Sequence, residues 1–137
     1  MGQRLMFVDT SVVVAVLARE PEAGELVSKI EQAATACTAG HVLLEASMRL
    51  STMLGVSPLD AEAAIHAMFS EAGIDIVPIT REIAHEAVAA FARFGKGRGH
   101  DAQLNFGDCF SCACARLHNV PLLFKGRDFV ATDIARA

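Results

Sequence analysis

The chain has 137 residues, of which 53% are hydrophobic and 20% charged, and its formal net charge is −4. This length is typical of one domain that can bury a core, so we expect a single domain over residues 1–137. The negative charge argues against a generally cationic nucleic-acid coat, but it is compatible with a local basic strip or with an acidic metal site.

No segment predicts a secretory leader or a membrane span. The apolar run at 12–18 is short and ends in the sequence "REP", and no run approaches the roughly 18 apolar residues that a span needs. Three of the four cysteines, Cys109, Cys112 and Cys114, lie within six positions, which matches neither a disulfide framework nor a zinc finger. We therefore expect a cytoplasmic protein with reduced thiols and no membrane partner.

The hydrophobic pattern predicts strands that alternate with one or two helices. The first predicted elements are a strand at 5–8, a helix through residue 18 capped by Ser11, a helix from 21 to about 34 and a strand at 35–39. Helices follow from about 41 to 54 and from 57 to 72, then a strand at 74–79 and a helix at 81–94 capped by Thr80. A loop at 95–105 leads to a helix at 106–119 that ends at Asn119, a strand at 120–124, a turn, and a tail that is a short helix or an extended piece. Gly55, Gly73 and Gly95 stand where three of these helices end. This order predicts an α/β fold, with a parallel sheet covered by helices on both faces.

Two aspartates follow predicted strands, Asp9 after 5–8 and Asp128 after 120–124. An aspartate is a poor strand residue and is costly to bury without a partner, so Asp9 is better placed at the rim of the sheet than within it. In open parallel sheets the working groups gather beyond the carboxyl ends of the strands. We therefore expect both side chains at the same rim.

Two further acids are candidates for this rim. Glu45 interrupts an otherwise apolar helix face in "HVLLEAS", so its carboxylate should face inward or into a cleft. Asp108 falls in the first turn of its helix, where the helix dipole favours an anion. Each acid alone also has an ordinary structural role: Asp9 or Ser11 as a helix cap, Glu45 as an ion-pair partner of Arg49, Asp108 as a dipole partner, and Asp128 as a turn residue.

Four carboxylates can thus meet at one rim: Asp9, Glu45, Asp108 and Asp128. Alone they would repel one another and some would take up protons, but a divalent cation removes the repulsion. Carboxylate oxygens are hard ligands, which favours Mg²⁺, with Mn²⁺ as the alternative, over Zn²⁺. Thr10 or Ser11 could add a hydroxyl ligand or hold Asp9 by a hydrogen bond. Such an ion polarises a phosphoryl oxygen and generates hydroxide for in-line attack on a phosphodiester.

Five stretches of the chain resemble segments of the PIN-domain ribonucleases, and most closely of the VapC toxins of bacterial toxin–antitoxin pairs. They are "VDTSVVVAVL", "HVLLEAS", "RFGKGRGH", "QLNFGDCFSCACA" and "PLLFKGRDFVATDI", in register over almost the whole chain. The resemblance implies a three-layer α/β/α PIN fold, metal-dependent cleavage of RNA, and inhibition by a small VapB-type antitoxin. It also implies that Asp9, Glu45, Asp108 and Asp128 are the catalytic metal-site acids, with Asp128 the least secure ligand. Cys112 departs from the family pattern, because an aromatic residue is common there.

A basic, glycine-rich loop precedes the helix that carries Asp108. Arg93, Lys96 and Arg98 lie in or beside this loop, which is not a P-loop because no Ser or Thr follows "GK". Its cations could form a phosphate-binding strip that leads RNA into the acidic cleft, or only a solvated loop. Because the chain has no Trp or Tyr, base stacking would use Phe or Arg.

The first helices carry much apolar surface, in the runs at 12–17 and 48–54. The plain explanation is the core of an apolar α/β domain. The alternative is a groove for a partner segment or a face between two copies, and the family resemblance favours such an interface for part of this surface. We therefore expect an antitoxin partner and a homodimer.

Other functions stay open beside a metal-dependent endoribonuclease. A phosphatase with Asp9 as nucleophile would usually carry a second acid two residues on, where this chain has Ser11. A non-catalytic module would use the acids only for structure or partner binding, and a PIN nuclease of RNA processing would share the same site without being a toxin. The sequence leaves the RNA target and the number of metal ions open.

Overall fold

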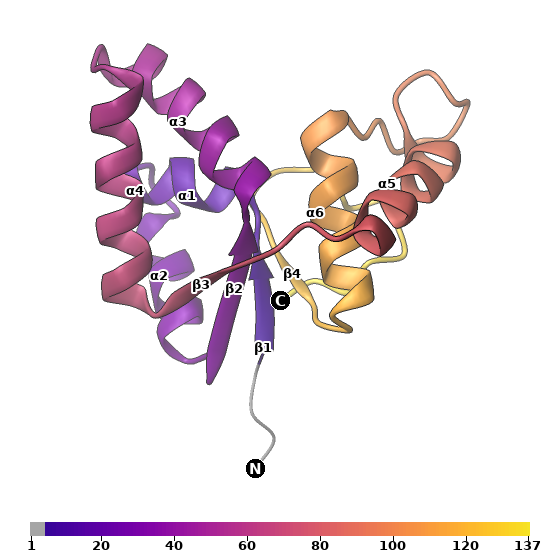
Figure 1. Cartoon of the computed structure of the whole chain (residues 1–137), viewed down its shortest axis with the longest axis horizontal. Coiled ribbons are helices and arrows are strands. Elements are labelled where there is room, and N and C mark those ends of the chain that lie inside the picture. Colours follow the sequence, from indigo (N-terminus) through magenta and orange to yellow (C-terminus); the bar gives the residue numbers. More distant parts are fainter. Residues whose placement is uncertain (1–4) are drawn as a thin grey trace.

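The computed structural model describes residues 5–137, and Figure 1 shows their arrangement. The elements in chain order are β1 (Leu5–Val8), α1 (Thr10–Leu17), α2 (Ala23–Glu31), β2 (Thr35–Ala39), α3 (Gly40–Leu54), α4 (Pro58–Ala72), β3 (Ile74–Val77), α5 (Arg81–Phe94), α6 (Phe106–Leu117) and β4 (Leu122–Leu123). The prediction that no segment is a secretory leader also covers residues 1–4, which lie outside the described residues. Within 5–137, no helix combines the length and the apolarity that crossing a membrane would require.

The strands form a parallel sheet in the order β3-β2-β1-β4. Phe7 of β1 pairs with Cys37 of β2 on one side and with Leu122 of β4 on the other, so β1 lies inside the sheet. Figure 1 shows α1 to α4 on the left of the sheet and α5 and α6 on the right. The predicted three-layer α/β/α fold with a parallel sheet is therefore confirmed, and the carboxyl ends of the strands point to one rim.

Most helix boundaries follow the local signals in the sequence. The hydroxyls of Ser57 and Thr80 cap α4 and α5 by accepting hydrogen bonds of 3.0 and 3.2 Å from backbone N–H groups in the first turn. Gly55 and Gly73 end α3 and α4 with φ values of 66° and 70°, a left-handed conformation that glycine adopts without steric cost. These predicted starts and stops are confirmed.

Other boundaries differ from the predictions. Asp9 caps α1, not Ser11, so this helix begins at Thr10. The strand β4 is Leu122–Leu123 rather than 120–124: β1 ends at Val8, which pairs with Leu123, and on the other side Pro121 has no N–H to donate to the ladder. The remaining differences are shorter or shifted ends: α2 spans Ala23–Glu31 instead of 21–34, β3 stops at Val77 instead of 79, and α6 stops at Leu117, with His118 rather than Asn119 as its cap.

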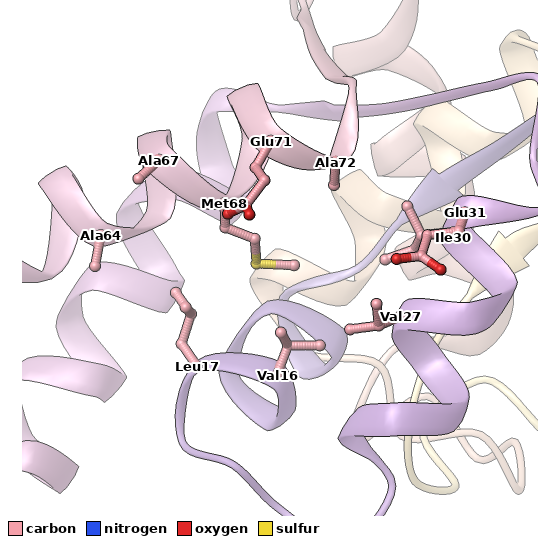
Figure 2. Close-up of a pocket in the computed structure, with 10 residues that line it drawn as sticks. All are labelled: Val16, Leu17, Val27, Ile30, Glu31, Ala64, Ala67, Met68, Glu71 and Ala72. Carbon is pink, nitrogen blue, oxygen red and sulfur yellow. The ribbon is translucent and has the colours of Figure 1, made fainter.

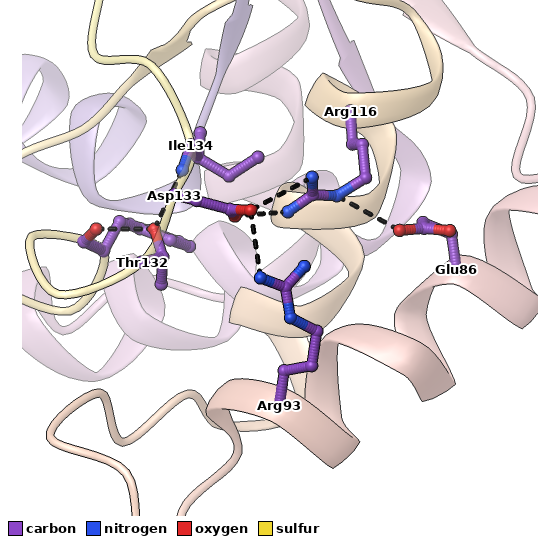
Figure 3. A network of polar contacts seen from close by, with 7 residues as sticks. Glu86, Arg93, Arg116, Thr132, Asp133 and Ile134 are labelled. Carbon is purple, nitrogen blue, oxygen red and sulfur yellow. Dashed lines mark hydrogen bonds and ion pairs between the residues drawn. The ribbon is translucent and has the colours of Figure 1, made fainter.

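The C-terminal tail forms turns and bends over 126–133 and one bridge between Arg136 and Leu122 instead of a helix, and Asp133 ties it to α5 and α6. Its carboxylate pairs with Arg93 at 3.1 Å and with Arg116, which also pairs with Glu86 at 3.1 Å (Figure 3). The hydrogen bond from Arg116 is the main reason that the pKa of Asp133 lies below its usual value. This network anchors the chain beyond the loop that carries Asp128.

Candidate active site

Asp9 stands directly after β1 and caps α1. Its Oδ2 accepts hydrogen bonds from the backbone N–H and the hydroxyl of Ser11, at 3.0 and 2.7 Å. The Ser11 hydroxyl in turn accepts the backbone N–H of Lys125, at 2.9 Å, so the loop after β4 holds the cap in place. Asp9 therefore caps a helix at the rim of the sheet. Its orientation is fixed by its position after β1 and by the loop after β4.

The carboxyl of Asp9 is only 4% exposed, which makes its ionised form costly. Burial raises the pKa of Asp9, and hydrogen bonds from Ser11 and from the Ser111 side chain lower it in part. Ser111 was not predicted from the sequence. The available signal is its position three residues after Asp108 on the same helix, which puts both side chains on one face of α6.

Glu45 reaches the same rim from α3. Thr10 donates a hydrogen bond of 2.6 Å from its Oγ1 to Oε1 of Glu45, which joins α1 to α3. The carboxylate also lies against the backbone of Gly107 in α6, where an added Cβ would come within 2.6 Å of Oε1. The two hydroxyl residues after Asp9 therefore orient different acids: Ser11 orients Asp9, and Thr10 orients Glu45.

Asp108 is 6% exposed and forms a capping box with Asn105 at the start of α6. Its Oδ2 accepts the Asn105 N–H at 3.1 Å, while its own N–H donates to Oδ1 of Asn105 at 2.9 Å. Burial is the main cause that raises the pKa of Asp108 to about 7. The hydrogen bond from Asn105 opposes this shift, and repulsion from Asp9, Asp128 and Glu45 adds to it.

Asp128 is the most exposed of the four predicted acids. It lies on the loop after β4, and its charge contributes to the raised pKa of Asp108, so the structure brings it to the same rim. Within residues 5–137, however, no three His, Cys, Asp or Glu side chains are arranged as a ready-made cation site. Oδ2 of Asp9, Oε1 of Glu45 and Oδ2 of Asp108 each accept a hydrogen bond from a protein donor.

His41, at the start of α3, contacts the site through Ser111. Its Nε2 lies 2.9 Å from the hydroxyl of Ser111, and its ring stacks almost parallel to Phe7, at 6.1 Å between centroids. Burial lowers the pKa of His41 to about 4, so the imidazole is neutral near pH 7. Nδ1 is buried without a hydrogen-bond partner in the described part of the chain, so a proton on Nε2, donated to Ser111, avoids a buried unpaired N–H.

The three cations predicted to bind RNA have different surroundings. Arg93 pairs with Asp133 at 3.1 Å, and its guanidinium lies 4.6 Å from the ring of Phe94. Arg98 is exposed and lies 5.8 Å over the ring of Phe91. Lys96 is exposed at the base of the loop, where its backbone N–H donates to Leu104 at 3.0 Å. All three side chains are exposed, and Arg93 differs in being engaged in an ion pair.

An apolar groove lies between α1, α2 and α4, towards the end of α1 that is remote from Asp9. Its volume is about 680 Å³, and Figure 2 shows the side chain of Met68 pointing into it. It is lined by Val16 and Leu17 of α1, Val27 and Ile30 of α2, and Met68 and Ala72 of α4. Two acids, Glu31 and Glu71, stand among these apolar side chains, so the groove suits an apolar segment that also carries positive charge.

Comparison with known proteins agrees with this architecture. The family profile of the PIN domain matches residues 6–135. The VapC ribonuclease Mb0640 of Mycobacterium bovis is 39% identical over 142 aligned positions, which cover 95% of this chain and 96% of that protein. A ribonuclease VapC of Mycolicibacterium smegmatis is 38% identical, with 95% of this chain and 98% of that protein covered.

Solved structures show the same fold at low sequence identity. VapC20 of Mycobacterium tuberculosis, described as a toxin that cleaves the sarcin–ricin loop, superposes with a TM-score of 0.75 at 21% identity, covering 96% of this chain and 98% of that one. VapBC2 of Rickettsia felis, solved on a DNA fragment from its promoter, gives a TM-score of 0.70 at 12% identity, covering 97% of each chain. The chain therefore belongs to the PIN-domain family, and its curated relatives place it among the VapC proteins.

Proposed function

We propose that residues 1–137 form one PIN domain that acts as a metal-dependent endoribonuclease of the VapC toxin type. The observation that carries this proposal is that acids from separate segments meet at one rim: Asp9 caps α1, Thr10 of α1 donates to Glu45, and Glu45 lies against Gly107, next to Asp108. Burial and the charges of the other three acids raise the pKa of Asp108 to about 7, which agrees with this arrangement. Acids from four different segments lie close enough to perturb one another, as expected at a catalytic site. The curated relatives named VapC ribonucleases support the same activity.

The donor set fits a hard divalent cation, because buried carboxylates that repel one another gain stability when a cation lies among them. Asp9, Glu45, Asp108 and Asp128 would hold Mg²⁺, or Mn²⁺ in its place. A cation held there would stabilise charge at the phosphoryl group and would lower the pKa of water towards neutrality. Ser11 and Thr10 keep two of the acids oriented, and Asp108 must lose its proton for the full negative charge to form.

The same geometry disfavours a phosphatase that uses Asp9 as nucleophile. Ser11 stands where the second acid would be needed, and its hydroxyl is already hydrogen-bonded to Asp9 and to the N–H of Lys125. A non-catalytic module would not require the acids to lie within reach of one another's charge. The structure therefore favours hydrolysis by an activated water over a covalent enzyme intermediate.

RNA cleavage is tested with purified protein, single-stranded and structured RNA, and Mg²⁺. We expect cleavage that EDTA abolishes and Mg²⁺ restores, and a loss of at least about 100-fold in Asp108→Asn, the size found when one group that supports charge stabilisation in the transition state is removed. Asp60→Asn is the matched control, because Asp60 occupies the corresponding first-turn position of α4 and is exposed. Cleavage that survives both EDTA and Asp108→Asn would contradict the proposal.

We further propose that a VapB-type antitoxin inhibits the enzyme and seats an apolar, positively charged segment in the groove between α1, α2 and α4. The apolar lining, the acids Glu31 and Glu71 and the likeness to the VapBC2 fold support this partner. A homodimer through the exposed apolar side chains of α3, among them Leu44, Met48 and Met53, completes the assembly. Light scattering of the purified chain tests the dimer.

The antitoxin site is tested in cells by growth. Expression of the chain should arrest growth, and co-expression of a VapB-type reading frame next to its gene should relieve the arrest. Ala67→Arg fills the groove and should abolish relief, while RNA cleavage in vitro continues. His66→Arg, on the other flank of α4 beside Glu62, is the control and should still be relieved. Relief of both variants would place the antitoxin elsewhere.

A further inference from the structure

Phe106 is an apolar side chain that the protein leaves in water beside its acidic site. It is the first residue of α6 and is 80% exposed. Its exposed neighbours along the chain, Gln103 and Asn105, are polar, so it does not continue a run of apolar residues. A first-turn position accepts many residue types, so helix formation alone does not explain a phenylalanine there.

The ring of Phe106 is held by other rings rather than by the core directly. It packs edge-on against Phe110, at 5.3 Å between centroids, and Phe110 packs at 5.5 Å against His41. His41 stacks on Phe7, which is fully buried in β1. This row of rings runs from the sheet to the surface and supports Phe106 on a rigid base, with one face of the ring left for another aromatic group.

Phe106 lies between the site acids and the basic loop. The next residue, Gly107, contacts the Glu45 carboxylate, and Asp108 follows directly after it. The loop that carries Lys96 closes immediately before α6, because Lys96 donates its N–H to the carbonyl of Leu104. An exposed ring and the acid Asp108 therefore follow directly after a loop with exposed cations, and stacking combined with backbone charge is how proteins bind single-stranded nucleic acid.

We propose that Phe106 is a stacking platform for one nucleobase of single-stranded RNA, next to the bond that the site acids cleave. This inference rests on the proposed ribonuclease function and adds a substrate contact to it. Every base presents a π face, so the contact binds single strands with little sequence preference and excludes a fully paired helix. The residues next to it in the chain, Asn105 and Gly107, add no apolar side chain, so the ring offers a face for one base, and a change of oligomeric state in the test below would instead indicate a protein partner.

The chain lacks Trp and Tyr, so Phe106→Trp gives a single-tryptophan protein whose emission reports on this position alone. We place it in an Asp9→Asn background to prevent cleavage and titrate it with a short single-stranded RNA of mixed sequence in Mg²⁺. Stacking should quench the emission as RNA binds. Leu117→Trp, at the other end of α6 and 46% exposed, is the control and should keep its emission. Unchanged emission of Phe106→Trp while RNA binds overturns the inference.

Cleavage kinetics provide the second readout. Phe106→Ala should raise KM by about 5-fold to 150-fold with a smaller change in kcat, the range that corresponds to loss of one stacked base. Phe106→Trp should restore KM, whereas Phe106→Leu, which keeps apolar bulk without a π face, should not. An unchanged KM in Phe106→Ala, or full rescue by Leu, overturns the inference, as does a changed oligomeric state with unchanged RNA affinity.

The two proposals fail in different ways. Cleavage by the parent protein with no effect of Phe106→Ala overturns the stacking platform and leaves the ribonuclease standing. RNA binding that quenches Phe106→Trp, with no cleavage by the parent protein, supports the platform and overturns the ribonuclease. Absence of any RNA binding overturns both.

Discussion

The hydroxyl of Thr10 donates a hydrogen bond of 2.6 Å to the carboxylate of Glu45, 35 positions further along the chain, and so connects α1 to α3. The hydrogen bond holds Glu45 against Gly107 at the rim that also carries Asp9 and Asp108. A hydroxyl beside the first acid thus positions the second one. Several expected outcomes depend on contacts of this kind.

Thr10→Val keeps the shape of the side chain but removes the donor to Glu45. A hydrogen bond to a charged group contributes about 1.5–3 kcal/mol, so we expect kcat/KM to fall by about 10-fold to 150-fold. Thr10→Ser keeps the hydroxyl and should stay within a few-fold of the parent. Equal activity of Val and Ser at this position would show that Glu45 does not depend on Thr10.

Gly107→Ala should reduce activity without unfolding the protein. The new Cβ would come within 2.6 Å of Oε1 of Glu45, which must move away from the rim. Gly24→Ala in α2 is the control, because nothing lies within 4 Å of its Cβ and alanine favours a helix by up to about 1 kcal/mol. Thermal unfolding separates the two effects: both variants should stay folded, and only Gly107→Ala should lose cleavage.

The stability of the metal-free protein should fall as pH rises from about 4 to about 7. In the folded state the pKa of Asp108 is about 7, against 3.8 for an unperturbed aspartate, so over this interval the folded chain holds a proton that the unfolded chain has released. The raised pKa of Asp9 acts in the same direction. Urea unfolding in EDTA measures this slope, and Asp108→Asn should flatten it. A slope of opposite sign would contradict the buried, protonated acid.

Mg²⁺ should stabilise the protein more at pH 8 than at pH 5. Binding to the site acids competes with the proton on Asp108, whose pKa is about 7, so affinity should rise through that value. The shift in melting temperature on adding Mg²⁺, measured at both pH values, reports this directly. Glu31→Gln, which changes an acid of the apolar groove, should leave the shift unchanged.

Ser111→Ala and His41→Phe should impair the same contact to Asp9. Ser111 lowers the pKa of Asp9, and His41 holds the Ser111 hydroxyl from a distance of 2.9 Å. We expect both variants to lower kcat and to move the acidic limb of the pH–rate profile to higher pH. The double variant should show less than the sum of the two effects, since both remove one chain of hydrogen bonds. If the two effects on kcat added fully, His41 would not act through the Ser111 hydroxyl.

Much of the fold could be predicted because its signals are local. Short apolar runs, hydroxyl caps such as Thr80, and the stops Gly55 and Gly73 depend only on residues within a turn of one another. The acids Asp9, Glu45, Asp108 and Asp128 were identified in the same way, and their roles as metal ligands stay a prediction. The choice of Asp9 over Ser11 as the cap of α1 could not be predicted, because Lys125, from the other end of the chain, engages the Ser11 hydroxyl.

The sequence by itself determined the order of strands and helices, the apolar core and the presence of four acids near strand and helix ends, since each follows from periodicity and from the charge of single residues. Only the tertiary structure decided which groups face one another: Thr10 with Glu45, Glu45 with Gly107, His41 with Ser111, and Arg93 with Asp133. These pairs join residues that lie 35 to 70 positions apart. Their distances depend on how the helices pack on the sheet, which no local pattern encodes.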